Sequence, residues 1–470
     1  MRFTFDGKSF EGFAGDTLAS ALLAAGETLF GRSFKYHRPR GLVGAGAEEP
    51  NALITVDRGG GRFTPNLRAT AIEIYDGLNA RSQNRWPSLK TDFGAINDRL
   101  GRFFPAGFYN KTFMWPRSFW EKLYEPAIRR MAGLGDAPSE TDPDDYAAGH
   151  AHCELLIIGA GPAGIDAALE ASGTNKRVIL IDEQDELGGG ALSDPALWPW
   201  LERSRKALAD ARNITVLTRT TAFGYFHDNF IGAIERLTDH LATTGTGPRE
   251  KLWKIRAGEV ILAQGAIERP LVFEGNDTPG VMLASAAKVW ALRYGVAVGK
   301  NVALMAAHNS GWKDAVALHN AGVAVSTIID VRDVIEPDLV EAAVREHFIQ
   351  DAYDLAVQRT CNERTHSPLL FVHQSVRILH RRTLSSLLSV SARRRSVQSK
   401  AQHRRRRRLG FFSIGVAADA AASISSSALP GSSAQPVFAS ARRPVVTAHW
   451  SAAHSHANGE CKARRAPDPR

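Results

Sequence analysis

The sequence predicts an α/β fold with a small N-terminal sheet-and-helix domain, a larger domain of alternating strands and helices, and a basic tail. Three observations predict it. A hairpin and a helix pattern fill the first 75 residues, strand and helix patterns alternate from residue 153, and regular periodicity is lost near residue 345. A chain of 470 residues has room for two to four domains.

The first 80 residues show the pattern of a β-grasp, ferredoxin-like domain. Residues 2–5 alternate as a strand, Asp6-Gly7 is a hairpin turn signal, and residues 8–13 can return as a second strand. After a long loop rich in Gly, Arg and Pro, further strands are expected over residues 53–56 and 69–74. A hairpin, a helix, a long loop and more strands follow one another as in a β-grasp sheet.

The single helix of this domain is expected over residues 17–25. Leu18 and Leu22 recur there at helical spacing. Asp16 can cap its N-terminus, and Gly26 sits where a C-terminal cap belongs.

Residues 81–150 are predicted to be an aromatic-rich connector that ends in a linker. Residues 135–150 are acidic, small and Pro-containing, which is typical of an interdomain linker. The aromatic residues before it are expected to pack across a domain surface. They are Trp86, Phe103, Phe104, Tyr109, Trp115, Trp120 and Tyr124.

The region 151–345 reads as a Rossmann-like domain. Residues 155–158 form an apolar β run, which is followed by the letters GAGPAG, a helix pattern and a second β run over residues 178–181. Further strands are expected at 215–217 and 260–263. A second β-α-β pattern is expected over 301–305, 312–320 and 323–329.

The strongest local signal is Gly159-x-Gly161-x-x-Gly164, placed between a β run and a helix. The first glycine permits a tight turn, the second lets a pyrophosphate approach the backbone, and the third lets helix and strand pack closely. Asp182 and Glu183 end the second strand, where an acid accepts hydrogen bonds from the adenosine ribose. An acid there favours NAD or FAD over NADP, and the motif predicts a FAD/NAD(P)-binding fold.

Two later segments support a bound dinucleotide. Residues 187–190 form a glycine loop after the second strand, and residues 260–266 form an apolar strand that ends in small residues. Either could instead be a plain turn or core strand. The candidate cofactor-binding residues are Gly159, Gly161, Pro162, Ala163, Gly164, Asp182, Glu183, Gly189, Gly190 and Gly265.

The second β-α-β pattern, residues 301–330, lacks the glycine triplet. Its first loop is residues 307–311, and its second strand ends at Asp330. It could bind ligand directly or serve only as scaffold.

The net charge of +9 comes from the tail. Residues 351–470 hold 20 Lys and Arg against 6 Asp and Glu, which leaves 38 basic and 43 acidic residues for 1–350. The segment 346–470 is therefore expected to be a disordered basic tail. It is either an extension that binds nucleic acid or an acidic surface, or the product of a frameshift in a GC-rich gene. We favour the frameshift. It would be supported if another reading frame of the coding DNA beyond codon 350 encodes a coherent protein.

Composition excludes several classes of protein. Cys153, Cys361 and Cys461 are too few for a disulfide framework, and no Cys-x-x-Cys or zinc-like histidine pair is present, so no metal site is predicted. No apolar run reaches the roughly 20 residues of a membrane span. The N-terminus lacks a signal-peptide pattern, and a cytoplasmic location is expected.

Four strings resemble the α subunit of heterotetrameric sarcosine oxidase: GRSFKYHRPRG (31–41), LLIIGAGPAGIDAALEA (155–171), FGYFHDNFIGAIERLTDHL (223–241) and AIERPLVFEGNDTPGVM (266–282). The resemblance covers roughly residues 1–345. It implies an NAD-binding, truncated α subunit of a complex that oxidatively demethylates sarcosine with O2 to glycine, formaldehyde or methylene-tetrahydrofolate, and H2O2. The partners that it implies are a β subunit together with smaller subunits. The β subunit would hold FAD and the amine substrate, with FMN near the α–β interface, so no catalytic residue is assigned to this chain.

Two departures from this resemblance stand out. Related α subunits of amine and opine dehydrogenases carry a [2Fe–2S] cluster, which needs four thiolates, yet residues 32–50 contain no cysteine. The N-terminal domain is therefore expected to be cluster-free. The resemblance also does not extend to the family's C-terminal, aminomethyltransferase-like half. The alternatives are an FAD-dependent amine or opine dehydrogenase-type subunit, and a non-enzymatic fragment whose tail binds nucleic acid.

Overall fold

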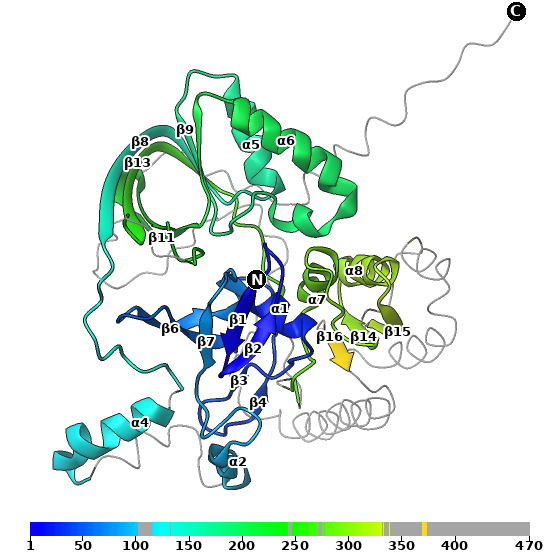
Figure 1. The fold of residues 1–470 in the computed structure, drawn as a ribbon. Helices are drawn as coiled ribbons and strands as arrows, with labels where there is room; N and C mark the ends of the chain where they lie inside the picture. Colours follow the sequence, from blue (N-terminus) through cyan, green and yellow to red (C-terminus); the bar gives the residue numbers. More distant parts are fainter. Residues whose placement is uncertain are drawn as a thin grey trace, which may run out of the picture. The chain divides into compact units, whose positions relative to one another are not determined.

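The computed structural model describes residues 1–101, 115–131, 133–242, 247–270, 275–276, 278–330, 332, 338 and 369–373. Three main sheets organise them (Figure 1). A short pair, β3 and β4, joins Gly31–Arg32 to Pro39–Arg40 and closes the Arg-rich loop of the N-terminal domain.

The N-terminal sheet has five strands in the order β2-β1-β7-β5-β6. β1 and β7 run parallel, and the other neighbours are antiparallel. One helix, α1, packs against this sheet, which is the expected β-grasp arrangement. The bounds are β1 Arg2–Phe5, β2 Lys8–Glu11, α1 Leu18–Ala24, β5 Leu53–Asp57, β6 Phe63–Arg68 and β7 Asn79–Ser82.

The N-terminal cap of α1 lies one residue later than predicted. Thr17 is the N-cap: its side chain accepts from the Ser20 amide while the Ser20 hydroxyl accepts from the Thr17 amide. Asp16 supports this capping box by accepting the Ser20 hydroxyl at 2.7 Å. Gly26 adopts φ +82° just after the helix, as a C-terminal glycine should.

The expected strand over residues 69–74 is wrong. Ala69–Ala71 is a 3-10 turn, and the segment that follows lies against α1, where the Leu18 amide donates to Ile72 O at 2.7 Å. Its buried apolar residues cover the helix instead of pairing in the sheet. β6 and β7, which the sequence did not predict, take the strand positions.

The second sheet has six strands in the order β10-β9-β8-β13-β12-β11. β8, β9, β10 and β13 are parallel, β12 pairs antiparallel with β13, and β11 pairs antiparallel with β12. Helices α5 and α6 lie together on one face (Figure 1) and cover a buried apolar core. The bounds are β8 Tyr146–Ile158, α5 Pro162–Ser172, β9 Val178–Ile181, α6 Trp198–Asp210, β10 Ile214–Leu217, β11 Thr220–Phe226, β12 Phe230–Arg236 and β13 Glu250–Leu262.

The β-α-β unit around the glycine motif is therefore confirmed, but its first strand is longer than expected. β8 begins at Tyr146, inside the predicted linker, because residues 146–153 pair in register with β13 from Glu250 onward. Their exposed residues alternate with half-buried ones, so the apolar run of a buried strand starts only near Leu155.

The second β-α-β pattern is confirmed as β14 Asn301–Ala306, α8 Asn309–Asn320 and β15 Ala324–Asp330, with β14 and β15 parallel. Helix α7, Ala284–Leu292, packs beside α8. A further strand within the predicted tail, β16 Leu369–His373, pairs antiparallel with β14. The rest of the tail lies outside the described residues.

The aromatic connector does not pack as a whole across a surface. The side chains of Trp86, Trp115 and Trp120 are 67%, 81% and 46% exposed. Phe103, Phe104 and Tyr109 lie outside the described residues. The connector includes α2, Ile96–Arg99, and α4, Glu125–Met131.

Candidate dinucleotide site

The glycine loop joins the end of β8 to the start of α5. Gly159 has φ +102°, and a Cβ there would lie 2.4 Å from Ala263 O. A Cβ on Gly164 would lie 1.8 Å from Gly159 O. The first and third glycines are thus required by the backbone, as the motif predicts.

Gly161 differs from its two neighbours in the motif. Its φ is −72°, and a Cβ built on it meets nothing within 4 Å. It is the N-cap of α5, with Pro162 at the first helical position and Ala163 next. Open space in front of the amino end of an 11-residue helix is where a pyrophosphate would be bound by helix amides.

The second glycine loop lies against the first. The Gly188 amide donates to Ala160 O at 2.8 Å, and a Cβ on Gly189 would lie 2.9 Å from Gly161 Cα. Gly190 has open space within 4 Å, as does Gly265, which follows β13 with φ +76°. The structure therefore brings residues 159–164 and 188–190 together, and the Cβ positions of Gly161 and Gly190 in these loops are open, as is that of Gly265 after β13.

Arg205, on α6, was not predicted as part of this region. Its guanidinium donates to Leu187 O at 3.1 and 2.5 Å and so holds the second glycine loop. No sequence motif marks it.

The two acids at the end of β9 have different surroundings. Asp182 accepts from the amides of Ala160 at 2.6 Å and Gln184 at 2.8 Å, so both of its oxygens bind backbone. Burial raises its pKa, and these two amides act in the opposite direction. Burial and the nearby Asp182 carboxylate raise the pKa of Glu183.

Arg293, just after α7, places a positive charge beside the residues that follow β9. It donates to Gln184 Oε1 at 2.6 Å and Asp185 Oδ1 at 3.3 Å, and its charge opposes the rise in the pKa of Asp182. It lies more than 100 residues beyond the glycine motif in the chain.

In the second β-α-β unit, the acid at the end of the strand bonds to the protein itself. Asp330, at the end of β15, accepts from Trp312 Nε1 at 2.7 Å and from the Arg332 guanidinium at 2.7 Å. Its side chain is 1% exposed, so it is committed to the protein. This arrangement favours a scaffold role for the unit over direct binding of a ligand.

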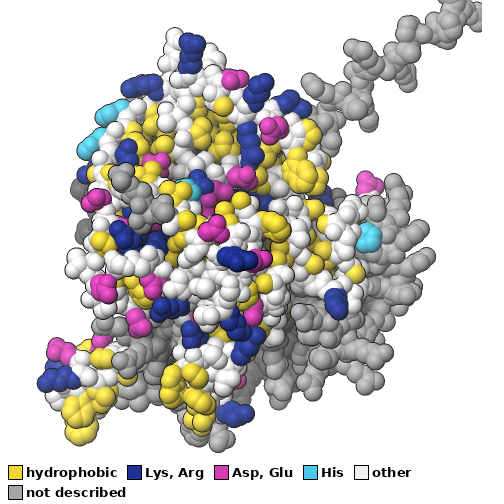
Figure 2. Space-filling view, in the orientation of Figure 1, with side chains coloured by type: hydrophobic (Ala, Val, Ile, Leu, Met, Phe, Trp, Pro, Cys, Tyr) yellow, Lys and Arg dark blue, Asp and Glu magenta, His cyan; other side chains and the backbone are white. Residues whose placement is uncertain are grey.

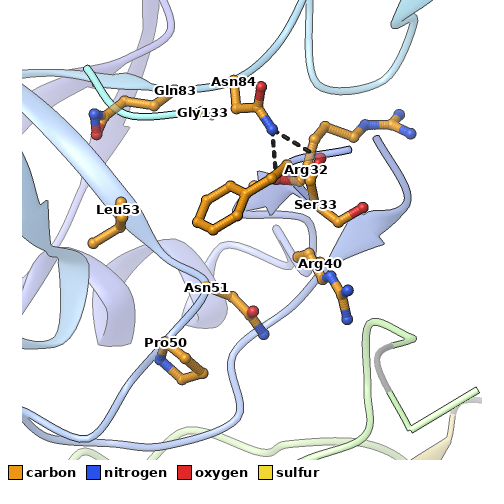
Figure 3. Close-up of a pocket in the computed structure, with 11 residues that line it drawn as sticks. Arg32, Ser33, Arg40, Pro50, Asn51, Leu53, Gln83, Asn84 and Gly133 are labelled. Carbon is orange, nitrogen blue, oxygen red and sulfur yellow. Dashed lines mark hydrogen bonds between the residues drawn. The ribbon is translucent and has the colours of Figure 1, made fainter. Parts of the chain in front are cut away.

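A separate cavity of about 250 Å³ lies in the N-terminal domain (Figure 3). Its lining includes Arg32, Phe34, Arg40 and Leu53, and none of its lining residues belongs to the glycine loops. Across it, the Asn84 amide donates to Arg32 O at 3.0 Å and Ser33 O at 2.8 Å.

We expect the backbone-required glycines to govern stability. Gly164→Ala should lower the free energy of unfolding by about 2–3 kcal/mol or more, because its methyl group would overlap Gly159 O. Gly161→Ala, whose methyl group meets nothing, should change it by less than about 0.5 kcal/mol. Urea denaturation of nucleotide-free protein measures both, and equal losses would contradict the geometry.

Cys153 is a buried free thiol on β8. Burial, with the neighbouring Glu154 charge, raises its pKa to about 11. At pH 8 about one thiol in a thousand would be ionised, so we expect native Cys153 to react with iodoacetamide at least about tenfold more slowly than in urea. Mass spectrometry of its peptide measures this, and equal rates would refute it.

Among the described residues, no three His, Cys, Asp or Glu side chains are grouped as metal ligands. Within the same part of the chain, no helix is long and apolar enough to cross a membrane.

The fold and the glycine loops define the class of this protein: it has the α/β fold of FAD/NAD-binding oxidoreductases. A family model described as pyridine nucleotide-disulphide oxidoreductase matches residues 153–366. A second model, described as a 2Fe-2S iron-sulfur cluster binding domain, matches residues 1–85.

More particularly, the chain resembles the N-terminal part of sarcosine oxidase α subunits. It is 54% identical over 339 residues to the one from Rhizobium meliloti (strain 1021), covering 71% of this chain and 34% of that protein. The one from Corynebacterium sp. (strain P-1) is 35% identical over 351 residues, with 72% and 31% covered. The chain thus spans about a third of the length of these relatives.

Two looser likenesses accompany these. An opine oxidase subunit of Agrobacterium tumefaciens (strain Ach5) is 30% identical over 194 residues, 38% of this chain and 36% of that protein. L-Proline dehydrogenase from P. horikoshii aligns at 23% identity with a TM-score of 0.47, over 70% of this chain and 53% of that chain, a likeness that carries no functional argument.

Proposed function

We propose that this chain is the NAD-binding portion of the α subunit of a sarcosine oxidase complex. That complex would convert sarcosine, water and O2 to glycine, formaldehyde and H2O2. With tetrahydrofolate as acceptor in place of water, the one-carbon product would be methylene-tetrahydrofolate. The partners would be a β subunit, which holds FAD and the amine substrate, and smaller subunits, with FMN near the α–β interface.

The observation that carries the proposal is the open space between the two glycine loops, which we call the cradle. Gly161, Gly190 and Gly265 leave space where a side chain would otherwise stand. Helix α5 begins at this space, and acids end the adjacent strand β9. These features fit a dinucleotide lying with its pyrophosphate at the helix and its adenosine ribose at β9.

Each part of the chain would have a definite task. The amides at the start of α5 would bind the pyrophosphate, Glu183 would accept ribose hydroxyls, and Asp182 would hold the loop by its bonds to backbone. A bound nicotinamide dinucleotide supplies a hydride-accepting ring. An acid at the ribose disfavours a 2′-phosphate, which supports NAD over NADP.

We also propose that the N-terminal domain holds no iron–sulfur cluster, although its family model is described as binding one. A [2Fe–2S] cluster needs four thiolates, and residues 1–85 contain no cysteine. The loop before β5 is instead organised by Glu49, which is 1% exposed. Its carboxylate accepts from the amides of Val43 and Gly44 on one oxygen and Asn51 and Ala52 on the other.

A cytoplasmic location belongs to the proposal, supported by a chain with only three cysteines, of which Cys153 is a free thiol.

The likeness to the opine oxidase subunit of Agrobacterium tumefaciens supports one alternative, an FAD-dependent amine or opine dehydrogenase-type subunit. The cradle fits the adenosine half of FAD equally well.

One measurement tests these proposals together. The full chain is purified and denatured, the released nucleotide is identified by chromatography with absorbance detection, and iron is measured in the same sample. Stoichiometric NAD without flavin or iron is the expected result. FAD would transfer the assignment to the alternative, no nucleotide would overturn the site, and stoichiometric iron would overturn the cluster-free domain.

A further inference from the structure

Two loops of the N-terminal domain are joined into one surface, which we call the aromatic face: residues 31–41 and 84–101. His37 Nδ1 lies 2.6 Å from Asp92 Oδ2, and Arg38 Nε donates to Asp98 Oδ1 at 2.7 Å. Arg32 Nε donates to Leu89 O at 2.9 Å. The two loops therefore hold each other in one conformation.

Asp92 is the centre of this arrangement. Its side chain is fully buried, and besides His37 it accepts from the Trp86 amide at 3.0 Å and the Gly94 amide at 3.1 Å. The backbone on both sides of Trp86 and Phe93 is thus ordered by buried polar contacts. The rings of Trp86 and Phe93 meet edge to face at 5.2 Å between centroids.

The side chains displayed by this ordered backbone are apolar and exposed. Trp86 is 67% exposed, Phe93 58% and Ile96 58%. Hydrophobic side chains gather over α2 in the space-filling view, with Lys and Arg beside them (Figure 2). Preorganised, exposed aromatic residues that the chain's own core does not use are typical of a protein–protein interface.

Charge identifies the kind of partner. The two loops carry seven Lys and Arg against two Asp, of which Asp92 is buried. Asp6 and Glu27 from neighbouring segments pair with Arg85 and Lys90, so the face keeps a net positive charge of about three. A second copy of the same face would bring like charges together, and the chain's own tail, with 20 basic and 6 acidic residues over 351–470, is also cationic. An apolar partner surface with an acidic rim complements this face.

We propose that the aromatic face docks a separate protein subunit whose contact surface is apolar at its centre and acidic at its rim. This inference rests on the proposed function, in which the chain works within a complex. It adds the surface by which the partner is recognised: Trp86 and Phe93 would be its anchors, and Lys90 and Arg99 would belong to its rim.

The test is co-expression of the full tagged chain with the β subunit of the Rhizobium meliloti sarcosine oxidase, followed by size-exclusion chromatography and measurement of Kd. Trp86→Ala with Phe93→Ala should weaken binding at least about thirtyfold. Lys90→Glu with Arg99→Glu should weaken it about tenfold, more at low salt than at high salt. The matched control, Phe223→Ala with Phe226→Ala, alters side chains that are 55% and 52% exposed on β11 and should change Kd less than twofold.

Several outcomes would overturn the inference. Unchanged binding by both face variants would do so while leaving the proposed function intact. No binding by the wild-type chain would remove both the inference and the proposed partner, whereas the nucleotide content of the same sample would still report on the NAD site. A homodimer or co-purified nucleic acid that the face variants release would assign the face to a different occupant.

Discussion

Gly161→Asp is expected to weaken dinucleotide binding about a hundredfold without unfolding the protein. The new carboxylate would face the pyrophosphate at the start of α5. Two like charges about 5 Å apart cost about 3 kcal/mol at an effective dielectric constant near 20, which corresponds to about a hundredfold in Kd. The folded chain accepts the substitution because a Cβ at Gly161 meets nothing within 4 Å and φ is −72°. Nucleotide content after purification, and titration calorimetry with NAD on stripped protein, measure the effect.

The same helix offers a matched control. Gly173 caps the other end of α5, with φ −78° and open space around its Cβ position. Gly173→Asp adds the same carboxylate to the same helix, away from the glycine loops, and should bind nucleotide like the wild type. Equal nucleotide content in the two variants would show that the bare cradle is not the binding site. The Tm of Gly161→Asp should match that of nucleotide-free wild-type protein.

Arg249→Met is expected to lower the free energy of unfolding by about 2–3 kcal/mol, because the buried carboxylates of Asp239 and Asp144 each lose one of their two cations. Asp144 keeps Arg62 at 2.6 Å, and Asp239 keeps Arg58 at 3.4 Å. Arg249 Nε donates to Asp239 Oδ1 at 2.7 Å, and its Nη1 lies 3.4 Å from Asp144 Oδ2. The side chains of all three are between 6% and 14% exposed. Arg249 Nη2 also donates to Thr64 Oγ1 at 2.9 Å, so one guanidinium joins the linker, β6 and the segment before β13.

Arg177→Met provides the comparison at the surface. Arg177 and Glu154 form a bidentate pair with side chains 65% and 44% exposed, and solvent-exposed pairs of this kind contribute little to stability. Urea denaturation of both variants measures the contrast. A loss at Arg249 no larger than that at Arg177 would mean that water reaches the buried network.

Much of the fold could be predicted where neighbouring residues in the sequence contain the whole pattern. The unit β8-α5-β9 follows from two apolar runs, three spaced glycines and a helix pattern, all within about 30 residues. The unit β14-α8-β15 is of the same kind. The strands β6 and β7 could not be predicted, because their burial is partial and their residues include Pro65 and Asn66. Pairing with β5 decides that they are strands.

The candidate site, too, could be predicted only where its residues lie within one local motif. Gly159, Gly161 and Gly164 were expected from spacing. The backbone requires glycine at Gly159 and Gly164, whereas a Cβ at Gly161 meets nothing. The choice between Asp182 and Glu183 stayed open in the sequence. The structure adds that both oxygens of Asp182 accept backbone amides, which spacing along the chain does not reveal.

The sequence by itself therefore determined the α/β class, the glycine loop, the acids after β9 and the absence of thiolates from the first 85 residues. These are local properties, since each depends on residue type and spacing within one supersecondary unit. Only the tertiary structure decided that Arg205 holds the second glycine loop, that Arg293 stands beside β9 and that Asp330 is committed to Trp312. Hydrogen bonds and ion pairs between distant segments depend on how sheets and helices pack in space, which no spacing along the chain records.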